Sequence, residues 1–268
     1  MLPLYKKKLF LFDMDGTLWL GDRLFDGTME LLSRIRSMGA RYLFVTNNSS
    51  TSAAGYVKKL ARLGIASVPC DFLTSTYATS LYIKKNCPDK TFFAVGTPDF
   101  ISEMREYGIS VTEKITDGTD GVILSNDTTI NFHKLEYACA LLRRGVTYIA
   151  TNPDWVCPAE GGYLPDCGSF AFLLEKATGR VPVFIGKPNP DMLTLAIARA
   201  GVTPEETVMV GDRMYTDIAS GVRAGIDTVF VLSGEGTAQD AEASDFKPTY
   251  IMKDIKELSG RLGEKATE

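Results

Sequence analysis

The feature that most constrains the fold is the alternation of short apolar runs with amphipathic stretches along nearly the whole chain. Runs this short and continuously apolar are typical of parallel strands covered on both faces. The predicted strands are Leu9–Phe12, Tyr42–Val45, Phe92–Val95, Gly121–Leu124, Thr147–Ala150, Val183–Ile185, Val208–Val210 and Thr228–Leu232. The predicted helices include Met29–Met38, Tyr56–Leu63, His133–Arg144 and Asp191–Ala200. Strands that alternate with helices predict βαβ units and an α/β fold with a doubly wound parallel sheet.

The middle of the chain differs in its sequence pattern from the two ends. Residues 78–181 contain a complete βα series of their own, together with an irregular stretch, Asn152–Gly168, that is rich in Pro, Gly and Cys. We therefore predict that residues 78–181 form a second α/β domain. It is inserted into a discontinuous outer domain made of residues 1–77 and 182–268.

Composition excludes several classes of protein. The chain is 45% hydrophobic, which is enough apolar material for a buried core and excludes intrinsic disorder. It has 29 Lys and Arg against 33 Asp and Glu, so it lacks the basic surface of a nucleic-acid binder. With a single histidine, His133, the chain cannot build a multi-histidine zinc site.

Cysteine usage and hydropathy predict the compartment. The five cysteines are odd in number and form no C-x-x-C pair, which indicates reduced thiols in a cytoplasmic protein. Three lysines precede the apolar run Leu9–Phe12, but four residues are too few for a signal-peptide core. No run approaches the length needed to span a bilayer, so we expect a soluble protein without a membrane partner.

Polar motifs follow four of the predicted strands, at the edge of a parallel sheet where ligands bind. These motifs are Asp13-Met14-Asp15-Gly16-Thr17-Leu18, Thr46-Asn47-Asn48-Ser49, Gly186-Lys187-Pro188 and Gly211-Asp212-Arg213-Met214-Tyr215-Thr216-Asp217.

The first motif pairs two carboxylates. Asp13 and Asp15 are two residues apart, so continued strand geometry points both to one face. Such a pair supplies a nucleophile or metal ligand beside a potential acid, as a hydrolase requires. A calcium loop is excluded because Leu18 and Leu24 stand where glycine and glutamate are needed. On its own, the motif could equally be a solvated acidic turn.

The other motifs add one cation and more carboxylates. Lys187 follows a strand and precedes a helix, where it can present a positive charge to an anion, although an ordinary loop lysine would look the same. Asp212 and Asp217 add two carboxylates, which could simply cap a helix and charge its first turn; Asp217 could fill that role while Asp212 binds a metal. Oxygen ligands without histidine or cysteine favour Mg²⁺.

Taken together and in this order, the four motifs resemble the haloacid dehalogenase superfamily of aspartate-nucleophile phosphatases. The resemblance covers essentially the whole chain. It implies a Rossmann-like core sheet, and the long insertion between Thr46 and Lys187 resembles the α/β cap of the NagD-like, 4-nitrophenyl phosphatase-like branch. That branch contains phosphatases of sugar phosphates, nucleotides, phosphoglycolate and pyridoxal phosphate.

The resemblance also implies roles for individual residues. Asp13 is the nucleophile that forms an aspartyl-phosphate, and Asp15 is the acid and then the base. Mg²⁺ is held by the Asp13 carboxylate, the Asp15 carbonyl and Asp212, while Asp217 orients Lys187 or the metal waters. The implied phosphate-binding residues are Thr46, Asn47, Asn48 and Lys187.

We therefore expect a Mg²⁺-dependent hydrolase of small phosphorylated metabolites. The alternatives are a phosphotransferase or phosphomutase on the same scaffold, and a non-catalytic protein that binds a phosphate ligand. We expect substrate choice to depend on the cap segment Asn152–Gly168, with Asp154, Trp155 and Tyr163 as candidates. The resemblance also admits a homodimer formed through the cap.

Overall fold

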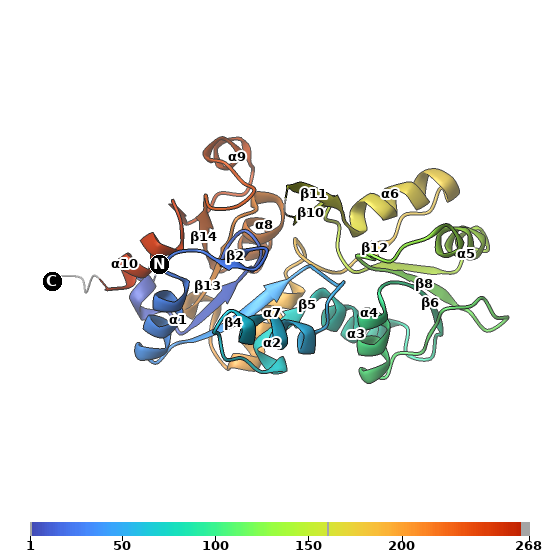
Figure 1. Cartoon of the computed structure of the whole chain (residues 1–268), viewed down its shortest axis with the longest axis horizontal. Coiled ribbons are helices and arrows are strands. Elements are labelled where there is room, and N and C mark those ends of the chain that lie inside the picture. The colour runs from blue at the N-terminus through green and yellow to red at the C-terminus, as the bar shows by residue number, and fades with distance from the viewer. Residues whose placement is uncertain (1, 160, 264–268) are drawn as a thin grey trace.

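The computed structural model describes residues 2–159 and 161–263, which form two parallel β-sheets with helices on both faces (Figure 1). The larger sheet has the strand order β15-β14-β13-β1-β4-β5. Its strands are β1 (Leu9–Phe12), β4 (Arg41–Thr46), β5 (Phe72–Thr74), β13 (Thr207–Gly211), β14 (Asp227–Val231) and β15 (Tyr250–Met252). We call this sheet and its helices the core domain.

The smaller parallel sheet has the order β12-β9-β8-β6-β7. Its strands are β6 (Phe92–Val95), β7 (Val111–Thr112), β8 (Gly121–Leu124), β9 (Thr147–Ala150) and β12 (Val183–Phe184). We call this sheet, its helices and the hairpin below the cap domain. Figure 1 shows the core and cap sheets next to each other along the longest axis.

Two antiparallel hairpins complete the strands: β2 (Trp19–Leu20) with β3 (Arg23–Leu24), and β10 (Val156–Ala159) with β11 (Gly162–Pro165). The helices are α1 (Thr28–Ser37), α2 (Ala53–Arg62), α3 (Ser75–Asn86), α4 (Pro98–Glu106), α5 (Phe132–Arg143), α6 (Cys167–Thr178), α7 (Asp191–Ala200), α8 (Ala219–Arg223), α9 (Ala238–Ala243) and α10 (Ile255–Gly263). Short 3-10 turns lie at Leu4–Lys6, Pro69–Asp71 and Pro204–Glu206, and a π-helical turn spans Met214–Ile218.

Side-chain alternation along the strands builds the packing of the core domain. In β1, Phe10 and Phe12 point to one face, where they pack with residues of α1, α2 and α10. Leu9 and Leu11 point to the other face and join a cluster that includes α7. Because both faces are covered, every residue of β1 is buried, and the strand reads as a continuous apolar run.

The second of these clusters continues into the cap domain. It contains Phe92, Ile123 and Ile149 of the cap sheet together with Leu11 and Met209 of the core sheet. The opposite face of the cap sheet packs against α5 and α6 in a separate cluster. The two domains therefore share a hydrophobic layer, and it lies on one side of each sheet.

The α/β fold with a parallel core sheet and an inserted cap is confirmed. Strands β1, β6, β8 and β9 and helix α7 occupy the predicted residues. The exact boundaries 1–77, 78–181 and 182–268 stay a prediction. Strand β12 (Val183–Phe184) belongs to the cap sheet, although it lies just inside the range 182–268 that the sequence assigns to the core. The prediction of an irregular Asn152–Gly168 was wrong, since β10 and β11 pair there. Their exposed or half-buried residues, with two prolines, give no apolar run to read.

Candidate active site

The charged groups of the sequence motifs meet at the carboxyl edge of the core sheet. Asp13 directly follows β1, and Asp212 directly follows the neighbouring strand β13. Lys187 follows β12, and Asp217 lies in the π-helical turn after Asp212. Carboxylate oxygens of Asp13, Asp212 and Asp217 all lie within 4.8 Å of one another, and the three residues are buried.

Lys187 lies at the centre of this group. Its ammonium donates to Asp13 Oδ1 at 2.7 Å, to Asp217 Oδ1 at 2.7 Å and to the carbonyl of Val45 at 2.9 Å. The side chain is 2% exposed. Burial lowers the pKa of Lys187, but the charges of Asp13 and Asp217 outweigh burial and raise it. Lys187 is therefore a permanent cation beside Asp13.

One lysine does not balance three carboxylates. Burial, and then the charges of Asp217 and Asp212, raise the pKa of Asp13 well above its usual range despite Lys187. Burial and the charge of Asp217 likewise raise the pKa of Asp212 to about 6. A divalent cation would relieve this repulsion, so the donor set fits Mg²⁺, which prefers carboxylate oxygens.

The backbone around Asp212 is shaped for this close approach. Asp212 Oδ1 accepts from the Thr17 hydroxyl at 3.1 Å, and Oδ2 accepts from the Glu235 backbone N–H at 2.8 Å. Gly16 has a φ of +90°, and a Cβ there would lie 2.4 Å from Asp212 Oδ2. Glycine at position 16 therefore permits both the turn after Asp15 and the contact with Asp212.

Asp15 lines the same pocket as Asp13, and among the residues that the structure describes only one of its two carboxylate oxygens has a partner. Its Oδ1 accepts from the Trp19 indole N–H at 2.7 Å and lies 3.5 Å from Lys59 Nζ. Within the described residues no hydrogen bond to Oδ2 is found, so that oxygen is available to a ligand. The sequence predicted Asp15, whereas Trp19 and Lys59 were not predicted.

The loop after β4 contributes hydroxyl and backbone groups. Thr46 Oγ1 accepts from the backbone N–H of Asn48 at 3.1 Å. The Asn47 amide is fully engaged, since it donates to Asp154 Oδ1 and the Lys187 carbonyl and accepts from the Lys187 N–H. Its backbone N–H, like that of Asp15, reaches no acceptor in the described part of the chain. These two N–H groups fit an anion in the pocket.

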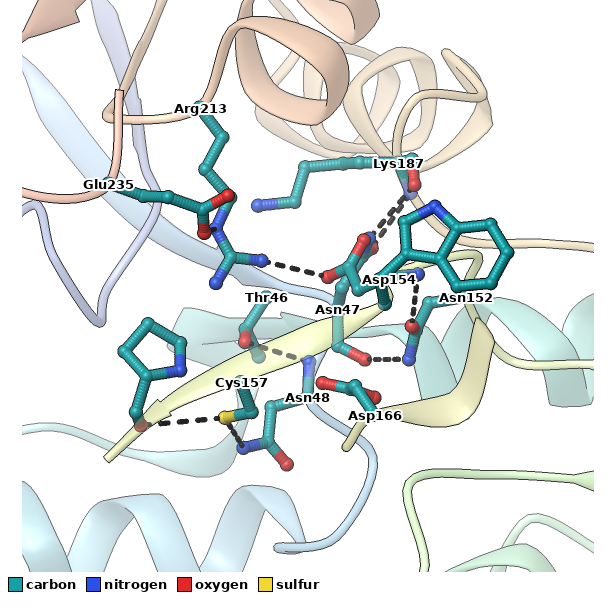
Figure 2. A network of polar contacts seen from close by, with 12 residues as sticks. Thr46, Asn47, Asn48, Asn152, Asp154, Cys157, Asp166, Lys187, Arg213 and Glu235 are labelled. Carbon is teal, nitrogen blue, oxygen red and sulfur yellow. Dashed lines mark hydrogen bonds and ion pairs between the residues drawn. The ribbon is translucent and has the colours of Figure 1, made fainter. Parts of the chain in front are cut away.

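A buried ion pair joins the cap domain to this edge. Arg213 Nη1 lies 3.2 Å from Asp154 Oδ2, and Arg213 Nε lies 2.9 Å from Glu235 Oε2. Figure 2 shows Asp154 between Arg213 and Asn47, which both donate to its carboxylate. Burial raises the pKa of Asp154 to about 6 although Arg213 opposes the shift. Asp154 therefore connects the cap to the loops that carry Arg213 and Asn47.

The other two cap candidates lie elsewhere. Trp155 is 55% exposed and packs edge-on against Phe172. Tyr163 is 59% exposed and lines a neighbouring hollow with Gly16 and Glu235. Neither lines the pocket of Asp13, and their contact with a substrate stays a prediction.

Residues that the sequence did not single out complete the pocket. Its lining includes Cys157, Pro158, Asp166, Arg213 and Thr216 beside the predicted groups. Arg213 and Thr216 belong to the fourth motif and could have been found there. Cys157, Pro158 and Asp166 do not follow a strand of either parallel sheet. The hairpin β10–β11 brings them to the pocket, so the pattern that located the other groups could not find them.

Comparisons with known proteins agree with this geometry. Residues 10–110 match the model of the haloacid dehalogenase-like hydrolases, and residues 184–258 match a HAD-hydrolase-like model. The acid sugar phosphatase of Staphylococcus aureus is 34% identical over 95% of this chain and 98% of its own length. The chain belongs to the haloacid dehalogenase-like hydrolases.

Solved structures of this hydrolase family refine the assignment. The 4-nitrophenylphosphatase of Thermotoga maritima superposes with a TM-score of 0.90 at 40% identity, over 96% of this chain and 98% of that one. The glycerol phosphate phosphatase of Mycobacterium tuberculosis, in complex with magnesium, gives 0.87 at 32% identity, over 94% and 76%. The NagD-like branch is confirmed, and the protein is a phosphatase. No helix in the described residues is both long and apolar enough to span a membrane.

Proposed function

We propose that this phosphatase hydrolyses phosphomonoesters of small metabolites, such as sugar phosphates, through a phosphorylated Asp13. The observation that carries the proposal is the contact between Asp13 and the buried Lys187 ammonium at 2.7 Å, beside two further carboxylates. Relatives named as phosphatases of sugars, glycerol phosphate and 4-nitrophenyl phosphate support the substrate class.

In the first step, an Asp13 oxygen attacks phosphorus as the bond between phosphorus and the ester oxygen breaks. Asp15 gives its proton to the departing oxygen. In the second step, Asp15 takes a proton from water, which attacks phosphorus and breaks the bond to Asp13. Inorganic phosphate leaves, and both aspartates return to their starting states.

The surrounding residues neutralise and position the phosphoryl group. Lys187 contributes a fixed positive charge, and the Thr46 hydroxyl and the N–H groups of Asp15 and Asn47 donate to phosphoryl oxygens. Asn48 holds Thr46 through its N–H. Asp217 orients Lys187, with which it forms a 2.7 Å ion pair.

Mg²⁺ fits the acidic group at this edge. Asp13, Asp212 and the Asp15 carbonyl would hold it, and the ion would supply charge neutralisation for the phosphoryl oxygens. The asymmetry between one lysine and three close carboxylates supports this assignment.

The test is a phosphate-release assay on 4-nitrophenyl phosphate and sugar phosphates with protein stripped by EDTA. We expect activity to return with Mg²⁺ and not with Ca²⁺, which tolerates bidentate carboxylates and would occupy both Asp13 oxygens. Full activity with EDTA present would overturn the metal assignment. Phosphate transfer to added glycerol in place of release would favour a phosphotransferase.

A further inference from the structure

The cap domain contributes an acidic wall to the active-site pocket. Among the described residues, those of the cap that line the pocket are Asp154, Cys157, Pro158 and Asp166. Burial raises the pKa of Cys157 to about 12, so its thiol is neutral at physiological pH. The cap therefore offers the bound ester two carboxyl groups and no cation.

The two carboxyl groups are not equivalent. Asp154 is neutralised by Arg213 at 3.2 Å. Asp166 is 3% exposed, and within the described residues it forms no ion pair. Its Oδ1 accepts from the Cys167 backbone N–H at 2.5 Å, which caps α6. The Asn152 side chain also interacts with this carboxyl group, but it carries no charge. Asp166 is thus a buried carboxyl group in the pocket without a balancing charge.

Capping α6 does not by itself require a negative charge. Asparagine and serine are as effective as aspartate at the N-cap, the residue just before a helix. A charged group in a desolvated pocket is costly unless a ligand interacts with it. We therefore infer that the charge at position 166 interacts with the substrate.

We propose that Asp166 selects phosphomonoesters whose leaving group presents hydroxyl or ammonium donors beside the ester, and rejects those that carry a carboxylate there. The proposal rests on the proposed function, because it concerns the leaving group of that reaction. A donor group satisfies the buried carboxyl, whereas a second carboxylate meets like charge without solvent between them. Selection by repulsion is a common source of specificity.

The charged neighbours of Asp166 make this selection depend on pH. Burial, and then the charge of Asp154, raise the pKa of Asp166 to about 7, while Arg213 on the facing core loop opposes the shift. The other titratable groups beside Asp166, the Cys157 and Cys167 thiols, stay neutral in this range, because burial raises the pKa of each to about 12. Asp166 consequently becomes more ionised between pH 6 and pH 8, and rejection of a carboxylated ester strengthens.

The test uses two esters that differ in one terminal group. Glycerol 1-phosphate ends in CH₂OH, and 3-phosphoglycerate carries a carboxylate at the same position. We expect wild-type kcat/KM to favour glycerol 1-phosphate about tenfold or more. In Asp166→Asn, which keeps the capping oxygen, this preference should fall about tenfold. It should rise between pH 6 and pH 8 in the wild type and stay flat in the variant.

A second variant and a matched control complete the design. Asp166→Ser also caps a helix without charge, so it replaces Asp166→Asn if thermal unfolding shows that the latter is misfolded. Asp117→Asn makes the same charge change at an exposed position of the cap and should keep the wild-type preference. An unchanged preference in folded Asp166 variants would overturn the proposal.

The remaining outcomes separate this inference from the function on which it rests. The wild type could hydrolyse 4-nitrophenyl phosphate and yet prefer 3-phosphoglycerate, or accept neither glycerol ester. Either result overturns the selection assigned to Asp166 and leaves the proposed phosphatase activity standing. Absence of hydrolysis of every ester in the presence of Mg²⁺ overturns the proposed function as well.

Discussion

The two parallel sheets are built alike, yet their carboxyl edges hold different polar groups. At the core edge, three buried carboxylates and Lys187 lie together with an excess of negative charge. At the cap edge, the groups after β8 and β9 are mostly neutral, as at Asn126 and Thr151. The cap acid Asp127 is balanced by Lys134 at 2.6 Å.

The neutral groups of the cap edge bind the core. The Asn126 N–H donates to Ser49 Oγ at 2.9 Å, Thr151 shares a 2.8 Å bond with Ser49, and Asn152 donates to the Asn47 carbonyl at 2.8 Å. These bonds hold the loop that follows Thr46. Polar residues at a strand end therefore do not identify a catalytic edge by themselves, whereas an unbalanced buried charge is typical of functional sites.

The largest expected effect is at the core edge. Asp13→Asn removes the proposed nucleophile and a proposed metal ligand, and we expect kcat to fall by at least about 10³-fold. Single-turnover phosphate release measures the loss, and circular dichroism checks that the fold is kept. Activity above about one percent of wild type would place the nucleophile elsewhere.

A second core variant tests the proposed role of Asp15 as the acid. Asp15→Asn cannot protonate a leaving alkoxide, so turnover of a sugar phosphate should fall about 10²-fold or more. The phosphorylation step with 4-nitrophenyl phosphate should suffer less, because nitrophenolate leaves without a proton. Rapid-quench measurement of that step with both esters gives the comparison. If the phosphorylation rate falls by the same factor with both esters, Asp15 does not act as the acid.

The ion pair between the two domains should have an intermediate effect. Arg213→Ala leaves the Asp154 carboxylate buried without its partner, which costs about 3 kcal/mol of unfolding free energy. The double variant Asp154→Asn with Arg213→Ala should recover part of that loss. As a control, Arg105→Ala breaks an exposed pair with Glu113 and should change stability by less than about 1 kcal/mol. Urea unfolding measures all of these, and equal losses in the two arginine variants would contradict the account.

A smaller effect is expected where the core positions its acid. Trp19→Phe removes the indole N–H that donates to Asp15 and keeps most of the buried ring. One hydrogen bond is worth about 1 kcal/mol, so kcat should fall about fivefold while KM stays near its wild-type value. A shift confined to KM would show that Trp19 acts on binding.

The last expected effect is a pH-dependent difference in stability within the cap. Burial and Asp154 raise the pKa of Asp166 to about 7 from an ordinary value of 3.8. Between about pH 4 and pH 7 the folded protein keeps a proton that the unfolded chain releases, so stability falls as pH rises through this window. Asp166→Asn lacks this dependence. From pH 5 to pH 8, the wild-type Tm should fall relative to the variant, by about a few degrees. Parallel curves would show that Asp166 has an ordinary pKa.

The sequence predicts the core edge better than the cap wall for a physical reason. Asp13 and Asp212 directly follow apolar strands of the core sheet, and parallel strands bring their ends to one edge. The local pattern therefore carries the position of these two groups. Lys187 follows β12 of the cap sheet, and its ammonium reaches Asp13 from there. The placement of Asp166 depends instead on tertiary contacts of a partly exposed hairpin.

Tertiary contacts also decide which of the predicted cap residues lines the pocket. Asp154, Trp155 and Tyr163 belong to one segment, yet only Asp154 turns into the pocket, where Asn47 and Arg213 hold it. Nothing in the local sequence distinguishes a side chain held by a distant arginine from one left in solvent. Trp19, which donates to Asp15, lies outside the strand-end motifs, so the sequence pattern did not single it out.

The most direct test of the central claim, that Asp13 of the core carries the chemistry for every substrate, is to trap the phosphorylated enzyme. Protein mixed with a ³²P-labelled ester and Mg²⁺ is quenched in acid, digested, and the labelled peptide is sequenced. We predict a hydroxylamine-sensitive label on Asp13 with each ester, retained in Asp166→Asn and absent in Asp13→Asn. A label on another residue, or one that persists in Asp13→Asn, would contradict the account.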